Sequence, residues 1–207
     1  PSLLPAYRGP APVARAILDG AERTGVAVFR VVAEVDAGPV ASAREVQILP
    51  GEDRPSLSAR LAEEGGRMLA EVIAALARGG AAWRPQEGTP SHAPKIRAEE
   101  MRIAWAHPAE RIWRTVRAGA GGPWAHTSFP DTGGARRLNL ARVEPCAAPS
   151  PGAPGTVHTV GGWPVVLCGA GAVRILSCRP AGAREMPGDA FLRGRPALAG
   201  RLLGGAP

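Results

Sequence analysis

The sequence predicts two domains of different class, an α/β domain over residues 1–83 and an all-β domain over residues 98–207. The chain has 207 residues, which is enough for two modest domains. In the first part, helical apolar periodicity alternates with runs of β-branched residues, as is typical of α/β structure. In the second part, short apolar runs are separated by turns rich in Gly and Pro, which indicates a small five-stranded β-barrel. Between them, the Pro- and Gly-rich stretch 84–97 predicts a basic linker.

The first part is predicted to hold a short helix and two strands. Residues 1–9 have the composition of an irregular loop. Pro12 precedes an apolar-periodic stretch, so we expect a helix at about 11–18, because Pro is tolerated in a first helical turn. The continuous apolar run 26–32 predicts a strand that is buried on both faces. The alternating pattern of 40–48 predicts an edge or half-buried strand.

A longer helix is expected after Ser56, which stands where an N-cap residue would. Apolar residues then recur at the helical spacing along one stripe: Leu57, Leu61, Met68, Val72, Ile73 and Leu76. Gly79 and Gly80 end this pattern.

The second part is predicted to begin with a strand at 102–105 and a helix at 109–118, whose Ile112, Trp113 and Val116 point inward. A last helix is expected at about 188–193. Further strands are expected at 124–129, 136–143, 156–160, 164–168 and 172–178. The sequence Gly169-Ala170-Gly171 resembles the start of a phosphate-binding loop, but a strand follows it instead of a helix. We therefore interpret it as a hairpin turn.

Charge is distributed unevenly along the chain. Residues 1–90 contain ten Arg and eleven Asp or Glu, whereas residues 91–207 contain fifteen Lys or Arg and seven acids, a net charge of +8. Such a basic segment favours a polyanionic partner such as RNA. The alternative is a GC-biased genome, since Lys95 is the only lysine. That bias accounts for Arg in place of Lys, but it does not account for the missing acids.

Several classes of protein are excluded by the sequence. No apolar run approaches the ~20 residues that a membrane-spanning helix needs, and no signal peptide is recognisable. Cys146, Cys168 and Cys178 lack a C-x-x-C spacing, so buried, reduced thiols are expected. The four histidines lack the spacing of metal ligands. We expect a cytoplasmic monomer that binds neither a metal nor a membrane.

Six short motifs resemble those of folate-dependent formyltransferases. Residues 1–12, PSLLPAYRGPAP, resemble S-L-L-P-x-Y-R-G-x-x-P, and TGV at 24–26 and VDAGP at 35–39 resemble T-G-V and L-D-T-G. In the second half, APK at 93–95, RIAW at 102–105 and FLRG at 191–194 resemble A-P-K, R-I-D-W and F-L-R-G of the methionyl-tRNA formyltransferase branch. The six motifs occur in the same order at similar intervals, which makes chance a poor explanation.

The resemblance implies a fold and a function. It implies the carboxy-terminal remnant of a Rossmann-like formyltransferase domain, which binds 10-formyltetrahydrofolate, followed by an OB-fold-like domain that binds initiator methionyl-tRNA. Asp36 would be the catalytic aspartate. The residues expected at the folate site are Ser2, Leu3, Leu4 and Pro5. Charge and position give these candidate tRNA contacts: Lys95, Arg97, Arg102, Arg114 and Arg117.

The sequence also departs from this pattern. Ala6, Ala37 and Ala104 replace the usual Arg, Thr and Asp, and the N-x-H segment that precedes S-L-L-P in the family is not part of the sequence. We therefore expect a fragment that is inactive by itself and whose residues 1–80 expose apolar surface. Taken without the resemblance, Asp36 in an Asp-Ala-Gly-Pro run is ordinary turn chemistry. Two other functions fit the sequence: another enzyme of the same core, such as a sugar-nucleotide formyltransferase or a formyltetrahydrofolate hydrolase, and a non-catalytic RNA-binding module.

Overall fold

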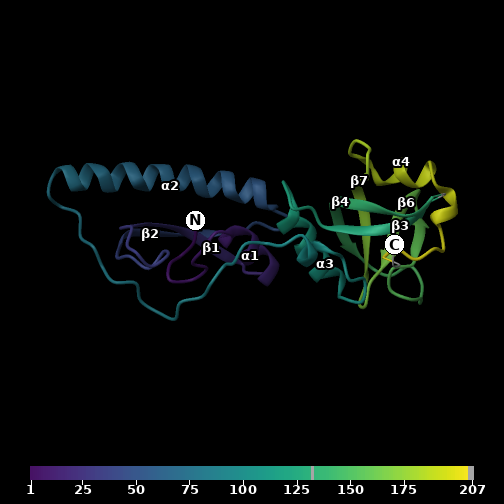
Figure 1. Cartoon of the computed structure of the whole chain (residues 1–207), viewed down its shortest axis with the longest axis horizontal. Helices are drawn as coiled ribbons and strands as arrows, with labels where there is room; N and C mark the ends of the chain where they lie inside the picture. The colour runs from purple at the N-terminus through teal and green to yellow at the C-terminus, as the bar shows by residue number, and fades with distance from the viewer. Residues whose placement is uncertain (132, 205–207) are drawn as a thin grey trace. The chain divides into compact units, whose positions relative to one another are not determined.

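The chain forms two compact units, Pro1–Ile96 and Arg97–Pro207 (Figure 1). The structure is a computed structural model, and it describes residues 1–131 and 133–204. The segment 84–96, predicted as a linker, is hydrogen-bonded to the first unit. The Ala93 N–H donates to the Arg8 carbonyl at 2.7 Å, and Val40 and Arg84 exchange two backbone hydrogen bonds of 2.7 and 2.9 Å.

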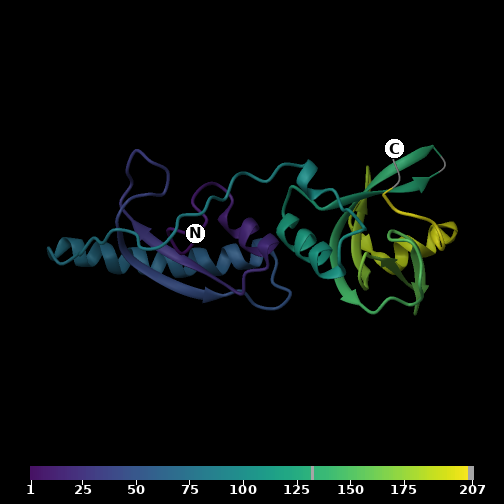
Figure 2. The same cartoon turned by 90° about the horizontal axis from the view of Figure 1, so that it is seen from below.

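The first unit consists of a hairpin and two helices. Its elements are α1 (Pro12–Asp19), β1 (Arg23–Phe29), β2 (Val40–Gln47) and α2 (Arg54–Ala77). The two strands pair antiparallel, with Val26 opposite Arg44, and α2 runs alongside them (Figure 2). The inward stripe of α2 buries Leu57, Leu61, Met68 and Val72. The predicted helix at 11–18 and the strand at 40–48 are confirmed to within one residue.

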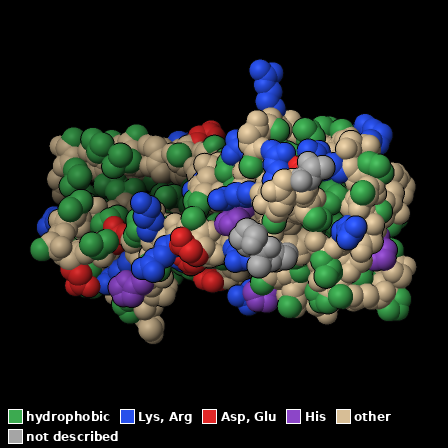
Figure 3. Space-filling view, turned by 45° about the vertical axis from the view of Figure 1, so that its right-hand side comes forward, with side chains coloured by type: hydrophobic (Ala, Val, Ile, Leu, Met, Phe, Trp, Pro, Cys, Tyr) green, Lys and Arg blue, Asp and Glu red, His purple; other side chains and the backbone are tan. Residues whose placement is uncertain are grey.

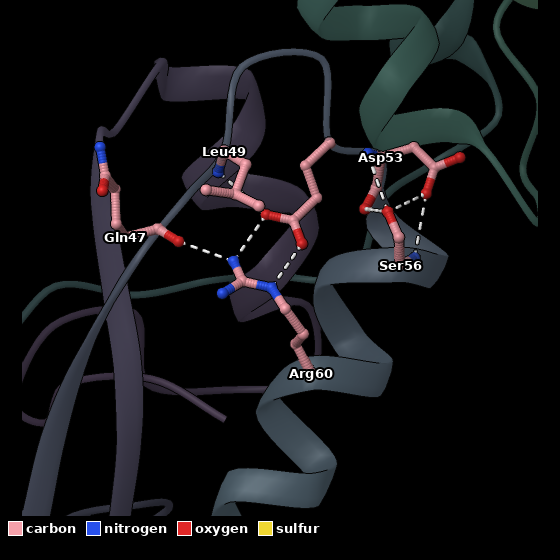
Figure 4. Close-up of polar contacts among 6 residues, drawn as sticks. Gln47, Leu49, Asp53, Ser56 and Arg60 are labelled. Carbon is pink, nitrogen blue, oxygen red and sulfur yellow. Dashed lines mark hydrogen bonds and ion pairs between the residues drawn. The ribbon is translucent and has the colours of Figure 1, made fainter.

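Two details of the first unit differ from prediction. The strand β1 ends at Phe29, and Val31 is 85% exposed, because β1 has a partner on only one edge among the described residues and its register shifts between Val28 and Phe29. The N-cap of α2 is Asp53, not Ser56. Asp53 accepts the Ser56 N–H at 3.0 Å, and the Ser56 hydroxyl oxygen accepts the Asp53 N–H at 3.2 Å, which forms a capping box (Figure 4).

The turn before α2 is fixed by an ion pair. Arg60 binds both carboxylate oxygens of Glu52, at 2.7 and 2.8 Å, and also donates to the Gln47 carbonyl at 2.7 Å (Figure 4). The same carboxylate accepts the Leu49 N–H at 3.0 Å. The end of β2 is thereby tied to the first turns of α2.

Exposed apolar surface is concentrated in the first unit, as expected. Figure 3 shows hydrophobic side chains gathered on the face of this unit that is in view. Part of the predicted stripe of α2 also faces outward: Ile73 is 56% exposed and Leu76 46%. The large exposed apolar residues of this unit are Val31, Val32, Val35, Leu49, Leu69, Ile73 and Leu76.

The second unit is built on one antiparallel sheet with the strand order β3-β4-β7-β6-β5, in which β8 pairs with β7. Its strands are β3 (His126–Asp131), β4 (Gly134–Cys146), β5 (Val157–Val160), β6 (Trp163–Leu167), β7 (Ala172–Pro180) and β8 (Met186–Pro187). Its helical segments are η1 (Glu99–Met101), α3 (Ala109–Gly119), α4 (Gly188–Arg193) and η2 (Pro196–Leu198). The helices at 109–118 and 188–193 are confirmed, and so are the five predicted strand positions.

The sheet curls around an apolar core, and the chain after η2 joins its two edges. The core includes Phe129 and Phe191, whose rings meet edge to face at a centroid distance of 5.3 Å. The Leu203 N–H donates to the Gly155 carbonyl before β5 at 2.9 Å, and the Gly204 N–H donates to the Ser128 carbonyl of β3 at 2.8 Å. In the described part of the chain, this tail therefore links strands β3 and β5, which are not paired with each other.

The predicted strand at 102–105 is wrong. Arg102 makes only an isolated bridge to His126, and the following residues turn instead of pairing. Trp105 is buried in the core of the second unit, and its indole N–H donates to the Thr127 hydroxyl at 3.1 Å. The apolar residues of this segment, Ile103 and Trp105, thus pack in the core without forming a strand. By contrast, the hairpin turn at 169–171 between β6 and β7 is confirmed, with Gly171 at φ +71°.

Candidate active site in the first unit

Asp36 lies on the loop between β1 and β2 in a left-handed backbone conformation, with φ +52°. Asp tolerates this region better than most residues with a side chain. Its carboxylate is half-buried, and Oδ2 accepts the Gly9 N–H at 2.8 Å. This hydrogen bond joins two of the segments that carry the family resemblance, residues 1–12 and 35–39.

The side chain of Gln86 binds the backbone of the loop that carries Asp36. The Gln86 amide nitrogen donates to the carbonyls of Asp36 and Gly38, at 2.7 and 2.8 Å. Its amide oxygen accepts two hydrogen bonds from the Arg8 guanidinium, at 2.8 and 3.2 Å, and Arg8 also pairs with Glu34 at 3.2 Å. Every polar atom of the Gln86 amide is therefore used. The amide fixes the loop between β1 and β2 relative to the loop before α1.

The loop also depends on two glycines. A Cβ at Gly38 would lie 1.7 Å from the Arg30 carbonyl oxygen, so a side chain there would displace the backbone. Gly9 has φ +120°, and a Cβ on it would lie 3.0 Å from the Ala93 carbonyl oxygen. Both glycines let backbone segments approach closely around Asp36.

Asp36 opens onto a pocket of about 230 Å³. Its lining consists of Pro1, Ser2, Leu4, Gly9, Pro12, Ala27, Phe29 and Asp36. The structure thus brings Asp36 together with two of the four residues expected at the folate site. Leu3 does not line this pocket but lies against Gly25 of β1, and Pro5 lies near Gly88.

Two residues of the first unit, Gln86 and Tyr7, make contacts that the sequence did not predict. Gln86 stands in the stretch predicted as a linker, and no local pattern marks its contact with a loop about fifty residues earlier in the chain. Tyr7 has φ +58°, and its hydroxyl donates to Asp19 at 3.0 Å. Burial raises the pKa of Tyr7 to about 12, with a further contribution from Asp19. The phenol is therefore neutral at physiological pH.

The five basic residues that were predicted to contact tRNA are divided between the two units. Lys95 belongs to the first unit, and Arg97 and Arg102 are exposed on the second. Arg114 of α3 pairs with Glu110 at 3.3 Å, and Arg117 lies 4.4 Å from the ring centroid of Trp113. Of the five, Arg102 lies beside His126 of the sheet, whose pKa its charge lowers together with that of Arg137.

The remaining titratable residues have no obvious catalytic arrangement. The structure contains no group of three or more His, Cys, Asp or Glu placed to hold a metal ion within residues 1–131 and 133–204. All three cysteines are free, with Cys168 and Cys178 buried. Over the same described ranges, no helix is both long and apolar enough to cross a membrane.

Comparisons with known proteins agree on one family. Residues 1–73 match the family described as formyl transferase, and residues 95–196 match formyl transferase, C-terminal domain. A methionyl-tRNA formyltransferase of Thermus thermophilus is 38% identical over 205 residues, and another of Methylobacterium nodulans is 39% identical over 196 residues. These alignments cover 99% and 94% of the chain, but only 65% and 62% of the two relatives.

The fold is also similar to solved structures. The structure of HypX from Aquifex aeolicus in complex with tetrahydrofolic acid superposes with a TM-score of 0.73 at 23% identity, over 93% of this chain and 34% of that one. The first unit is thus part of a Rossmann-like domain, and the second carries a curled sheet. From the two family matches and the relatives together, the chain belongs to the formyl transferase family.

Proposed function

We propose that the chain serves in the transfer of a formyl group from 10-formyltetrahydrofolate to the α-amino group of methionyl initiator tRNA. Relatives that are 38% and 39% identical carry the name methionyl-tRNA formyltransferase, and one structural neighbour was solved with tetrahydrofolic acid. The observation that carries the proposal is the pocket in which the half-buried Asp36 carboxylate meets Ser2 and Leu4.

Asp36 is proposed to support the proton-handling group of the reaction. Attack by an amine on the formyl carbon needs a base for the amine proton and hydrogen-bond donors for the developing oxyanion. Among the described residues that line the pocket, Asp36 has the only ionisable side chain. A carboxylate alone is a poor choice for both tasks, but it can orient and stabilise an adjacent imidazolium, as Asp does beside His in other acyl-transfer sites.

The other proposed roles follow from position and charge. Ser2 and Leu4 would contact folate directly, while Leu3 and Pro5 would shape the loop that carries them. The second unit, proposed to be an OB-fold, would bind the tRNA through its basic surface. We also propose that the protein acts as a monomer in the cytoplasm. The candidate tRNA contacts remain Lys95, Arg97, Arg102, Arg114 and Arg117.

The test measures formyl transfer by this chain joined to the part of the Thermus thermophilus relative that it does not match. The joined protein is expected to formylate methionyl-tRNA, and Asp36→Asn is expected to lower kcat by about 10²-fold or more. Glu63→Gln, an exposed change on α2, is the matched control and should leave kcat unchanged. If the joined protein folds, binds folate and transfers nothing, the function is wrong. If Asp36→Asn retains full kcat, only the role of Asp36 is wrong.

A further inference from the structure

The outward face of β3, β4 and β7 carries a row of polar side chains. His126 pairs with Asn139, and Asn139 pairs with Arg179, so the three side chains project from the same side of three adjacent strands. Their chain neighbours Leu138 and Cys178 are buried in the core on the opposite side. The row therefore faces away from the core.

Two further arginines, Arg102 and Arg137, lie beside this row, which itself includes Arg179. The backbone of Arg102 forms an isolated β-bridge with His126, and the Arg137 guanidinium donates to the Asn139 side-chain oxygen at 2.9 Å. The Arg179 guanidinium lies 5.3 Å from the ring centroid of Trp124. We call this set the β3–β4–β7 patch, and it consists of Arg102, Trp124, His126, Arg137, Asn139 and Arg179.

The three arginines of the patch differ from four other arginines of the unit, which form ion pairs. Arg114, Arg136, Arg174 and Arg193 each pair with a carboxylate, at distances of 2.6 to 3.3 Å. Within the described ranges, Arg102, Arg137 and Arg179 form no such pair. Three cations of one surface that form no ion pair favour the approach of a polyanion.

The pKa of His126 is affected by the positive charges of this patch. Burial lowers the pKa of His126, and the charges of Arg137 and Arg102 lower it further, while Glu99 of η1 and a hydrogen bond to the Trp124 carbonyl act in the opposite direction. The imidazole is therefore neutral at pH 7. An anion bound beside Arg102 and Arg137 would offset their charges and raise the pKa of His126.

We propose that the β3–β4–β7 patch is the surface on which the second unit binds the phosphate backbone of RNA. This inference rests on the proposed tRNA function and deepens it by naming the contact surface. Arginine forks match phosphate oxygens in two-point contacts, and Asn139 and Trp124 add a polar group and an aromatic ring for a base. Trp124 is half-buried beneath Arg179, so it is poorly placed to insert into a lipid surface.

The test is a binding titration of the whole 207-residue chain with an initiator tRNA transcript at 50 and 200 mM salt. Arg137→Gln and Arg179→Gln are each expected to weaken binding about tenfold. Each change is also expected to reduce the slope of log affinity against log salt by about 0.7 to 0.9, because one phosphate contact is lost. Trp124→Leu should weaken binding with no change in this slope.

The matched control is Arg201→Gln. Arg201 is exposed, and its carbonyl accepts the Val157 N–H of β5, a strand that contributes no residue to the patch. It removes the same charge, so a loss equal to that of the patch variants would mean that net charge alone acts, and would overturn the patch. Wild-type-like binding by the patch variants would also overturn it. If the unaltered chain binds tRNA at neither salt concentration, the tRNA role itself is wrong. Equal affinity for anionic vesicles would assign the patch to lipid instead of RNA.

Discussion

The Gln86 amide donates a 2.7 Å hydrogen bond to the carbonyl of Asp36 and a 2.8 Å bond to that of Gly38. Gln86 therefore holds the backbone of the proposed catalytic loop, while the Gly9 N–H holds the carboxylate of Asp36 at 2.8 Å. One contact acts on the backbone of Asp36 and the other on its side chain, and both come from segments distant in the sequence. The position of Asp36 is a tertiary property of the first unit.

Replacing Gln86 by Ala is expected to loosen this loop. The change removes both donated bonds and leaves Arg8 without its amide partner, so we expect a loss of about 2 kcal/mol of unfolding free energy from the first unit. Hydrogen exchange at the Gly9 amide should become faster. Gln47→Ala, at an exposed position of β2, is the control and should stay within about 0.5 kcal/mol of the unaltered chain. Equal Gly9 exchange in the two variants would contradict this role.

The cap of α2 gives a second prediction. Asp53→Ala removes the acceptor of the Ser56 N–H and is expected to cost about 1 kcal/mol of unfolding free energy, measured by urea denaturation. Glu63→Ala breaks only an exposed i,i+4 pair with Arg67 and is expected to cost about 0.3 to 0.5 kcal/mol. A cost at Asp53 no larger than at Glu63 would show that the capping box contributes nothing measurable.

The cysteines differ in their expected reactivity. Burial is the main cause that raises the pKa of Cys168 and of Cys178 to about 12, and it also raises that of the half-buried Cys146. Since the thiolate is the reactive form, iodoacetamide at pH 8 should label Cys146 first in the native chain, and all three in urea. Mass spectrometry of digested protein measures this order. Prompt native labelling of Cys178 would mean that the sheet opens.

The success of sequence-based prediction depended on how local each pattern is. The helix of α3 and the hairpin at 169–171 were predicted because their signals, a helical apolar stripe and a positive-φ glycine, lie within the element itself. The prediction of a strand at 102–105 was wrong because Trp105 packs in the core from a turn, where the Thr127 hydroxyl accepts its N–H. Periodicity cannot distinguish those two uses of an apolar residue.

The same distinction applies to the site. Asp36, Ser2 and Leu4 could be named from motifs, and the structure places the three around one pocket. Gln86 and the β3–β4–β7 patch could not be named, because each depends on which strands or loops become neighbours. Net charge predicted a basic second unit, but it could not separate paired arginines such as Arg174 from unpaired ones.

The pH dependence of RNA binding tests the patch without any change to its arginines. In the free unit the pKa of His126 is lowered, chiefly by burial and further by Arg137 and Arg102, so His126 is neutral near pH 7. A phosphate bound beside it would raise that pKa, and binding would then take up a proton. Affinity for tRNA is therefore expected to increase as the pH falls from 7.5 to 5.5, by at most about tenfold per pH unit for one proton. His126→Gln should remove this dependence, whereas His92→Gln, at an exposed position of the first unit, should retain it. An unchanged pH profile in His126→Gln would show that no phosphate docks beside this imidazole.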